Sequence, residues 1–325
     1  MPSPESTTKT ITLGLFGARG SVGRELIGLL SHHDSIDLTA AWSGSLAGEQ
    51  VREHAPGAPE GLMYLEPDFE SLCNASPDAV ALALPNGKAH DAVEAMERSD
   101  HPPKVIIDLS ADYRFDTDWV YGLTEINREQ LRSATRIANP GCYASAMGLT
   151  LTPLGARAVG VPHCFGVSGY SGAGSTPSDR NNVERLTGGV LPYASVGHLH
   201  EQEVSHTQGR PIRFAPTVAP FERGIVMTTL FEFEQPTNAA EIGSIYTDAY
   251  SDEPLISIVG AEVPRVQDVV GTPNTLIGGI QVDPDNPTRC AVVCVLDNLL
   301  KGAASQALAN INLALGLPEL EGISS

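Results

Sequence analysis

The chain has 325 residues, enough for two domains with separate hydrophobic cores, and no apolar run in it approaches the length of a membrane span. Its net charge of −19 argues against general nucleic-acid binding, which requires a basic face. Five cysteines without disulfide-like spacing, and an N-terminal segment unlike a signal or transit peptide, predict a cytoplasmic protein. An anionic ligand would therefore need a local site made from arginines and helix N-termini.

Residues 11–16 predict a short strand that leads directly into a glycine-rich turn and then a helix. Strand, glycine turn and helix together are the context of a dinucleotide-binding fingerprint. Gly17 would allow the tight turn, Gly20 would let the backbone approach a pyrophosphate, and Gly23 would permit close helix–strand packing. The predicted helix carries one apolar face, formed by Val22, Leu26, Leu29 and Leu30.

Three further apolar segments, 36–43, 79–84 and 105–110, predict buried strands that end in small polar residues. Helical stretches between them predict a doubly wound parallel sheet, in which ligands bind beyond the carboxyl ends of the strands. This topology would place four segments around one crevice, namely Gly17–Gly23, Ser43, Pro85–Asn86 and Ser110–Arg114.

Residues 139–146, Asn-Pro-Gly-Cys-Tyr-Ala-Ser-Ala, place Cys142 after a Pro-Gly turn at the start of a predicted helix that stops at Gly155. A helix N-terminus favours a thiolate, so the pKa of Cys142 is expected to fall from about 8.5 to between about 3.5 and 7.5. Cys142 is thus a candidate covalent nucleophile. A buried structural cysteine that happens to follow a turn is the alternative.

After Cys142 the pattern changes. Residues 167–175 predict a small-residue loop, 225–233 and 289–296 alternate as in an antiparallel sheet, and 300–315 predict a final helix with one apolar face. We therefore predict an α/β protein with two domains. A doubly wound Rossmann-type nucleotide domain comprises residues 1–141 with 298–325, and an inserted α+β catalytic domain with a mostly antiparallel sheet comprises 142–297.

Two polar segments add candidate catalytic groups. His198 and His200 lie two apart with Glu203 beyond them, and imidazole can protonate a leaving group or stabilise a thiolate near neutral pH. Arg114 has a planar fork that suits a phosphate or carboxylate, although a domain-interface ion pair is the alternative. No further Cys or His cluster has zinc-like spacing, so no metal is expected. A nucleotide loop with a helix-capped cysteine indicates NAD(P)-dependent acyl chemistry through a thioester.

The chain closely resembles the N-acetyl-gamma-glutamyl-phosphate reductases of the aspartate-semialdehyde dehydrogenase superfamily. The matching segments span nearly the whole chain: 17–23, 83–87, 108–115, 139–146, 166–174, 198–203 and 296–304. The resemblance implies NADPH-dependent reduction of N-acetyl-gamma-glutamyl phosphate to N-acetyl-L-glutamate 5-semialdehyde and phosphate, through a Cys142 thioester, in arginine biosynthesis. It also implies a homo-oligomer, a dimer or tetramer, that acts on a small molecule.

The resemblance also implies roles for individual residues. Cys142 would be the nucleophile, His200 the acid/base and Arg114 the contact for the substrate phosphate. The other implied substrate-binding residues are Ser110, Asn139, Ser168, Gly169, His198 and Glu203. The implied cofactor-binding residues are Gly17, Arg19, Gly20, Ser21, Val22, Ser43, Pro85, Asn86, Ser171, Gly172 and Asn298.

Three positions depart from the pattern of the family. Ser145 replaces a usual threonine, Leu199 stands where many members have arginine, and Ser45 stands where an arginine often follows the second strand. Arg19 and Ser43 would then have to hold the 2′-phosphate of NADP. NADP remains the expected cofactor because the second strand does not end in the acidic residue that binds the ribose of NAD.

Two other functions are compatible with these motifs. A reductase of N-acetyl-aminoadipyl phosphate or aspartyl phosphate would share the cysteine chemistry and differ only in its pocket. A non-catalytic dinucleotide-binding regulator is the alternative from another class, but it would not need Cys142, His200 and Arg114 together.

Overall fold

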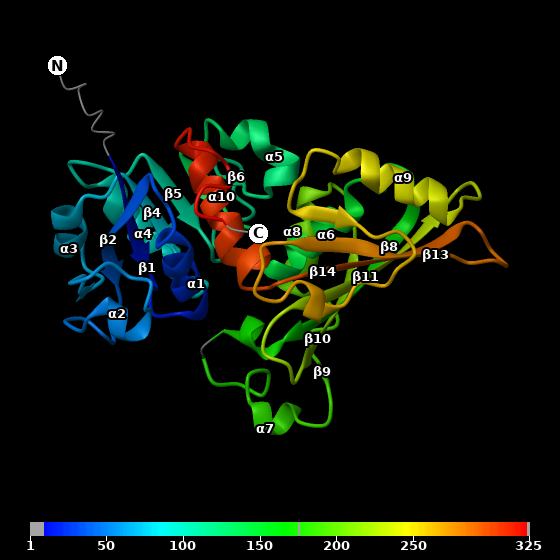
Figure 1. Cartoon of the computed structure of the whole chain (residues 1–325), viewed down its shortest axis with the longest axis horizontal. Coiled ribbons are helices and arrows are strands. Elements are labelled where there is room, and N and C mark those ends of the chain that lie inside the picture. Colours follow the sequence, from blue (N-terminus) through cyan, green and yellow to red (C-terminus); the bar gives the residue numbers. More distant parts are fainter. Residues whose placement is uncertain (1–9, 175, 324–325) are drawn as a thin grey trace, which may run out of the picture.

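The computed structural model describes residues 10–174 and 176–323. They form two seven-stranded sheets that lie beside each other, with the C-terminal helix between them (Figure 1). Within the described residues, no helix combines the length and apolar character that crossing a membrane requires.

The first sheet is built from the N-terminal part of the chain and is parallel at every pairing. Across the sheet its strands are β3 (Tyr64–Leu65), β2 (Ile36–Trp42), β1 (Ile11–Phe16), β4 (Ala79–Leu82), β5 (Val105–Asp108), β7 (Arg136–Ala138) and β6 (Val120–Tyr121). The connecting helices are α1 (Ser21–Leu30), α2 (Val51–His54), α3 (Phe69–Ala75), α4 (Ala89–Glu97) and α5 (Thr124–Leu131). Strands β4 and β5 are buried along their whole length, which explains the apolar sequence of β4 and of β5 up to Asp108.

The predicted doubly wound parallel sheet is therefore confirmed, with three strands shorter than expected. Strand β2 ends at Trp42, β4 at Leu82 and β5 at Asp108. Ala83, Leu84 and Leu109 instead line a cleft at the carboxyl end of the sheet.

The second sheet is mixed, and four of its six pairings are antiparallel. Across the sheet its strands are β12 (Ile256–Ile258), β13 (Thr275–Val282), β14 (Arg289–Leu296), β11 (Ile225–Phe233), β8 (Ala158–Gly169), β10 (Arg213–Ala219) and β9 (Leu191–Pro192). Its helices are α6 (Cys142–Leu151), α7 (Val183–Leu186), α8 (Leu199–Thr207) and α9 (Ala239–Ala249). Helix α6 packs on β11 and β14 and α9 packs on β13, and together they supply the second core.

The small-residue loop expected at 167–175 begins later than predicted. Residues 167–169 complete β8, pairing with β10 and β11, and a 3-10 turn, η1 (Tyr170–Ala173), follows. Position 175 lies outside the described residues. The error has a simple cause, because Val167, Ser168 and Gly169 have no alternating pattern of their own and gain their strand geometry from the neighbouring ladders.

The C-terminal segment starts with a π turn, η3 (Leu300–Ala304), and continues as α10 (Ser305–Ala314). Its apolar residues join the core of the first sheet, as expected. Burial extends beyond this apolar face, because residues 305–313 are all buried. Polar side chains on the other side are paired instead: Asn310 donates to the Gly122 carbonyl (2.8 Å) and to Asn139 Oδ1 (3.0 Å).

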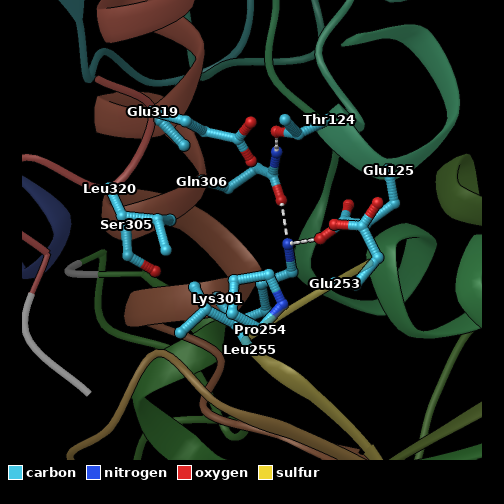
Figure 2. Close-up of a pocket in the computed structure, with 11 residues that line it drawn as sticks. Thr124, Glu125, Glu253, Pro254, Leu255, Lys301, Ser305, Gln306, Glu319 and Leu320 are labelled. Atoms are coloured by element: carbon cyan, nitrogen blue, oxygen red, sulfur yellow. Dashed lines mark hydrogen bonds and ion pairs between the residues drawn. The ribbon is translucent and has the colours of Figure 1, made fainter. Parts of the chain in front are cut away.

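A buried ion pair joins this C-terminal segment to α5 (Figure 2). Figure 2 shows the Lys301 ammonium between Glu125 and Gln306, and Nζ donates to Glu125 and to Gln306 Oε1, the latter at 2.6 Å. The side chains of Lys301 and Glu125 are each only 5% exposed. Gln306 in turn donates to Thr124 at the start of α5.

Lys301→Met is expected to destabilise the protein by about 3–5 kcal/mol, because Glu125 would remain as a buried carboxylate without its counter-ion. Urea unfolding of the two proteins measures this difference. The double variant Lys301→Met/Glu125→Gln removes both charges and should recover much of the loss. Equal destabilisation of the single and double variants would show that the ion pair is not the cause.

Candidate active site

A cleft of about 830 Å³ is lined by residues from both halves of the molecule. Loops that follow β1, β2, β4 and β5 contribute from the first sheet, and the starts of α6 and α8 contribute from the other side. The cleft brings together all but three of the residues predicted to form the site. Its lining includes Gly17, Arg19, Gly20, Ser21, Val22, Ser43, Pro85, Asn86, Arg114, Asn139, Cys142, Ser168, Ser171, Gly172, His198, His200 and Asn298.

Ser110, Gly169 and Glu203, which were expected to bind substrate, do not line the cleft. Ser110 is buried and its hydroxyl donates to Asp108 Oδ2 (2.7 Å). Gly169 packs so closely on its neighbour that a Cβ would lie 2.5 Å from the Glu222 carbonyl oxygen. Glu203 is fully buried behind the cleft wall. Of the three, Glu203 supports residues that line the cleft, because it bonds Arg114 and Gly141.

The glycine loop has the geometry of an anion cradle. Gly17 has a φ of +72°, and a Cβ there would lie 2.1 Å from the Ala83 carbonyl oxygen. A Cβ on Gly23 would lie 2.6 Å from the Gly17 carbonyl oxygen, so the helix and the turn are in direct backbone contact. Helix α1 follows Gly20 with no side-chain cap and no acidic residue in its first turn. This end of the cleft thus fits the pyrophosphate of a dinucleotide.

The cleft is locally positive although the chain carries a net charge of −19. Arg19, Arg114 and Arg180 line it, and among the described residues no aspartate or glutamate does. Strand β2 ends at Trp42 and is followed by Ser43. The end of this strand therefore carries no carboxylate that would repel the 2′-phosphate of NADP. These arginines therefore dominate the electrostatic potential in the cleft, because salt screens the charges of the surface acids over about 8–10 Å.

Cys142 is the first residue of α6 and is half-buried at the cleft floor, with Gly141 as the N-cap. Burial raises the pKa of the Cys142 thiol to about 11. The Tyr143 backbone N–H and the Arg114 charge lower the pKa but do not offset burial. The expectation of a low pKa from the helix N-terminus is therefore wrong for the protein without ligands, because desolvation exceeds the helix effect.

His200 lies against the turn that precedes the cysteine. A Cβ on Gly141 would lie 2.2 Å from His200 Nε2, so the imidazole covers the backbone of that residue. Burial, followed by the charges of Arg114 and His198, keeps the pKa of His200 well below 6.5. His200 Nδ1 is buried with no hydrogen-bond partner among the described residues. The site therefore starts from an uncharged thiol and an uncharged imidazole, a pair that can exchange a proton.

Alkylation of Cys142 by iodoacetamide should consequently accelerate about tenfold per pH unit from roughly pH 7 to pH 10, because the thiolate fraction rises steadily below a pKa near 11. Mass spectrometry of the Cys142 peptide at timed intervals separates its rate from that of Cys73, the other cysteine that is not fully buried. A rate that levels off near neutral pH would contradict the raised pKa and restore the helix-terminus expectation.

Glu203 holds the catalytic turn from behind. Its Oε2 accepts from Arg114 Nη1 (2.9 Å), and its Oε1 accepts from the Tyr121 hydroxyl (2.7 Å) and the Gly141 backbone N–H (2.9 Å). Arg114 Nε also donates to the Asn139 carbonyl (2.9 Å). The ion pair considered for Arg114 thus exists, and the guanidinium lines the cleft as well. Glu203, on helix α8 of the second half of the molecule, therefore fixes the turn at Gly141 and the side chain of Arg114, which both belong to the first half.

Four residues of the site were not identified individually by the sequence analysis. A Cβ on Gly302 would lie 2.7 Å from the Cys142 Cβ, so only glycine fits beside the cysteine. Tyr143 and Tyr193 line the cleft next to the histidines, with the Tyr143 and His200 ring centroids 5.9 Å apart. Arg180 lies over the Tyr193 ring. Gly302 lies in one of the segments that match the family, so the sequence could have indicated it. Arg180 lies in no sequence motif that would predict a place at the site.

Two family models match the chain. The model described as semialdehyde dehydrogenase, NAD binding domain, matches residues 12–134, and the one described as semialdehyde dehydrogenase, dimerisation domain, matches residues 142–298. Crystal structures of aspartate semialdehyde dehydrogenases share the fold. That of aspartate semialdehyde dehydrogenase II from Vibrio cholerae superposes with a TM-score of 0.75 at 19% identity, covering 94% of this chain and 98% of that one. The enzyme from Francisella tularensis gives 0.72 at 16% identity, covering 93% and 99%.

Closer relatives are named N-acetyl-gamma-glutamyl-phosphate reductase. The protein of Xanthomonas campestris pv. campestris is 49% identical over 98% of this chain and 99% of its own length. That of Stenotrophomonas maltophilia is 46% identical over 97% and 98%, respectively. The chain belongs to the semialdehyde dehydrogenase family, in the branch of the N-acetyl-gamma-glutamyl-phosphate reductases.

Proposed function

We propose that this protein is an NADPH-dependent reductase of N-acetyl-gamma-glutamyl phosphate that forms N-acetyl-L-glutamate 5-semialdehyde and phosphate in arginine biosynthesis. The observation that carries the proposal is the juxtaposition of Cys142, His200 and Arg114 in one cleft with a dinucleotide loop. The names of relatives at about half identity over nearly the whole chain support this choice of acyl phosphate.

The chemistry follows from the protonation states of the site. As Cys142 Sγ bonds to the γ-carbonyl carbon, its proton passes to the neutral His200. His200 returns this proton to the phosphate as the carbon–oxygen bond breaks, and Arg114 balances the charge of the leaving group. The Cys142 backbone N–H, at the start of α6, would stabilise the oxyanion that forms on the carbonyl. The product of this half-reaction is a thioester on Cys142.

A nicotinamide bound in this cleft would supply the hydride that reduces the thioester. The glycine loop at Gly17–Gly23 would hold the pyrophosphate, and Arg19 with Ser43 would hold the 2′-phosphate of NADP. As the hemithioacetal collapses to the aldehyde, a proton taken up through His200 restores the Cys142 thiol. On this division of labour, most groups that would hold the dinucleotide come from residues 1–141 with 298–325, and Cys142 and His200 come from 142–297.

The protein would act as a homodimer formed through the open face of the second sheet. Phe165 and Leu230 are 48% and 39% exposed on the strands β8 and β11, and Val159 is 43% exposed beside them. Large exposed apolar side chains on paired strands are typical of an interface. The dimerisation domain matched over residues 142–298 agrees with this choice. The cytoplasm suits such an enzyme, because the nucleophilic thiol must stay reduced.

The reverse reaction tests the substrate. The protein is mixed with phosphate, NADP and one of three semialdehydes, those of N-acetylglutamate, N-acetyl-aminoadipate and aspartate, and the absorbance of reduced nicotinamide is followed. We expect the largest kcat/KM with N-acetylglutamate semialdehyde. A preference for either other aldehyde would overturn the substrate assignment. Dinucleotide binding without turnover of any of them would instead indicate a regulator.

A further inference from the structure

Arg180 contributes a positive charge to the cleft that the mechanism above does not use. It lies in the loop between η1 and α7, is half-buried, and lines the cleft. Its guanidinium carbon lies 4.9 Å from the centroid of the Tyr193 ring, a cation–π distance that holds the planar group against the aromatic face.

This guanidinium has no counter-ion in the part of the chain that the structure describes. Within residues 10–174 and 176–323, Arg180 takes part in no ion pair, and the neighbouring Asp179 pairs with Arg185 instead (2.6 Å). No carboxylate of the described chain lines the cleft either. A partly desolvated arginine in such a place favours an anion supplied from outside the protein.

The position of Arg180 is at the catalytic end of the cleft. The ring centroids of Tyr193 and His198 are 5.5 Å apart, and those of His198 and His200 are 4.9 Å apart, so ring contacts lead from the arginine to the acid/base. Its charge acts on both neighbours: after burial, it is the next cause that lowers the pKa of His198 to about 4. The pKa of Tyr193 is raised by burial and by Cys142, and Arg180 opposes this rise.

The proposed substrate carries two anionic groups at opposite ends of a five-carbon chain, the acyl phosphate and the α-carboxylate. The two terminal carbons are roughly 5 Å apart when the chain is extended, and the phosphate lies beyond one of them. Arg114 lies at Cys142, where the phosphate leaves, and Arg19 lies at the glycine loop. We propose that Arg180 binds the α-carboxylate of the substrate and so selects acyl phosphates that carry this group. The proposal rests on the proposed function and adds a specificity-determining residue to it.

A substrate pair isolates the contact. N-acetylglutamate semialdehyde and acetamidobutanal differ only in the α-carboxylate, and both are assayed with phosphate and NADP. Arg180→Gln should lower kcat/KM for the carboxylated aldehyde about 10- to 100-fold, mainly through KM, and should leave the rate with acetamidobutanal nearly unchanged. Arg180→Lys should recover part of the loss, because it keeps the charge without the planar fork. Arg185→Gln, in the adjoining helix α7 and paired with Asp179, is the matched control and should change neither rate.

Two results would overturn the assignment. An equal loss on both aldehydes would show that Arg180 supports the loop or the cofactor, and an unchanged preference for the carboxylated aldehyde would show that another group binds the carboxylate. If the proposed function itself is wrong, the result can be distinguished from these two, because the wild-type protein would then turn over neither aldehyde. That outcome would remove the proposed substrate, and the assignment of Arg180 with it.

Discussion

Cys142→Ser should lower turnover of the proposed reaction by about four orders of magnitude or more. A hydroxyl is a far weaker nucleophile than a thiol, and the neutral His200 beside it is too weak a base to generate an alkoxide. The chemistry depends on a covalent bond to this one side chain, so positioning by the rest of the cleft leaves only a small residual rate. Steady-state turnover of N-acetylglutamate semialdehyde with phosphate and NADP measures the loss.

The same variant should leave the nucleotide end of the cleft intact. Trp42 lines the cleft, so quenching of its fluorescence reports NADP binding, and the dissociation constant should match that of the wild type. Urea unfolding should also be little changed, because serine and cysteine are similar in size. A serine variant that keeps more than a small fraction of wild-type turnover would contradict a covalent role for Cys142.

Gly141→Ala is expected to lower kcat/KM by about 10²- to 10⁴-fold, the range for a misplaced acid/base. The backbone angles of Gly141, φ −69° and ψ 149°, are accessible to alanine, so the effect comes from the added methyl group and not from backbone strain. That methyl group would lie 2.2 Å from His200 Nε2 and 2.8 Å from Arg114 Nη1, and both side chains must move away from Cys142.

Overpacking in Gly141→Ala should lower the free energy of unfolding by about 1–3 kcal/mol. This structural cost should be smaller than the cost of the variant to catalysis. Gly28→Ala is the matched control, because a Cβ at this position in α1 meets no atom within 4 Å and should cost no activity. Kinetics and urea unfolding of both variants separate the two effects. A Gly141→Ala enzyme of normal activity would show that His200 and Arg114 do not act from the positions that the structure gives them.

The parallel sheet could be predicted because the local sequence of each central strand is typical of a buried strand. Strands β1, β4 and β5 are largely buried on both faces, which favours mainly apolar sequences, and the turns after them contain glycine or small polar residues. The edge strands β3, β6 and β9 were not predicted, since each is two residues long and too short to show a period.

Most of the candidate site could be predicted as well, because the glycine loop and the cysteine turn are local motifs. What could not be predicted depends on contacts between distant segments. Glu203 bonds Arg114 across 89 positions and Gly141 across 62, so its place behind the cleft follows only from the fold. The raised pKa of Cys142 has the same origin, since desolvation depends on every neighbour of the thiol and not on the helix alone.

The central claim, a thioester on Cys142, is tested most directly by leaving out phosphate. The enzyme is mixed rapidly with N-acetylglutamate semialdehyde and NADP, and reduced nicotinamide is followed before and after phosphate is added. We expect a burst that approaches one equivalent per Cys142, absent in Cys142→Ser, and steady turnover only once phosphate releases the acyl group. Turnover with phosphate but no burst without it would show that oxidation requires phosphate from the start, which would contradict a thioester intermediate.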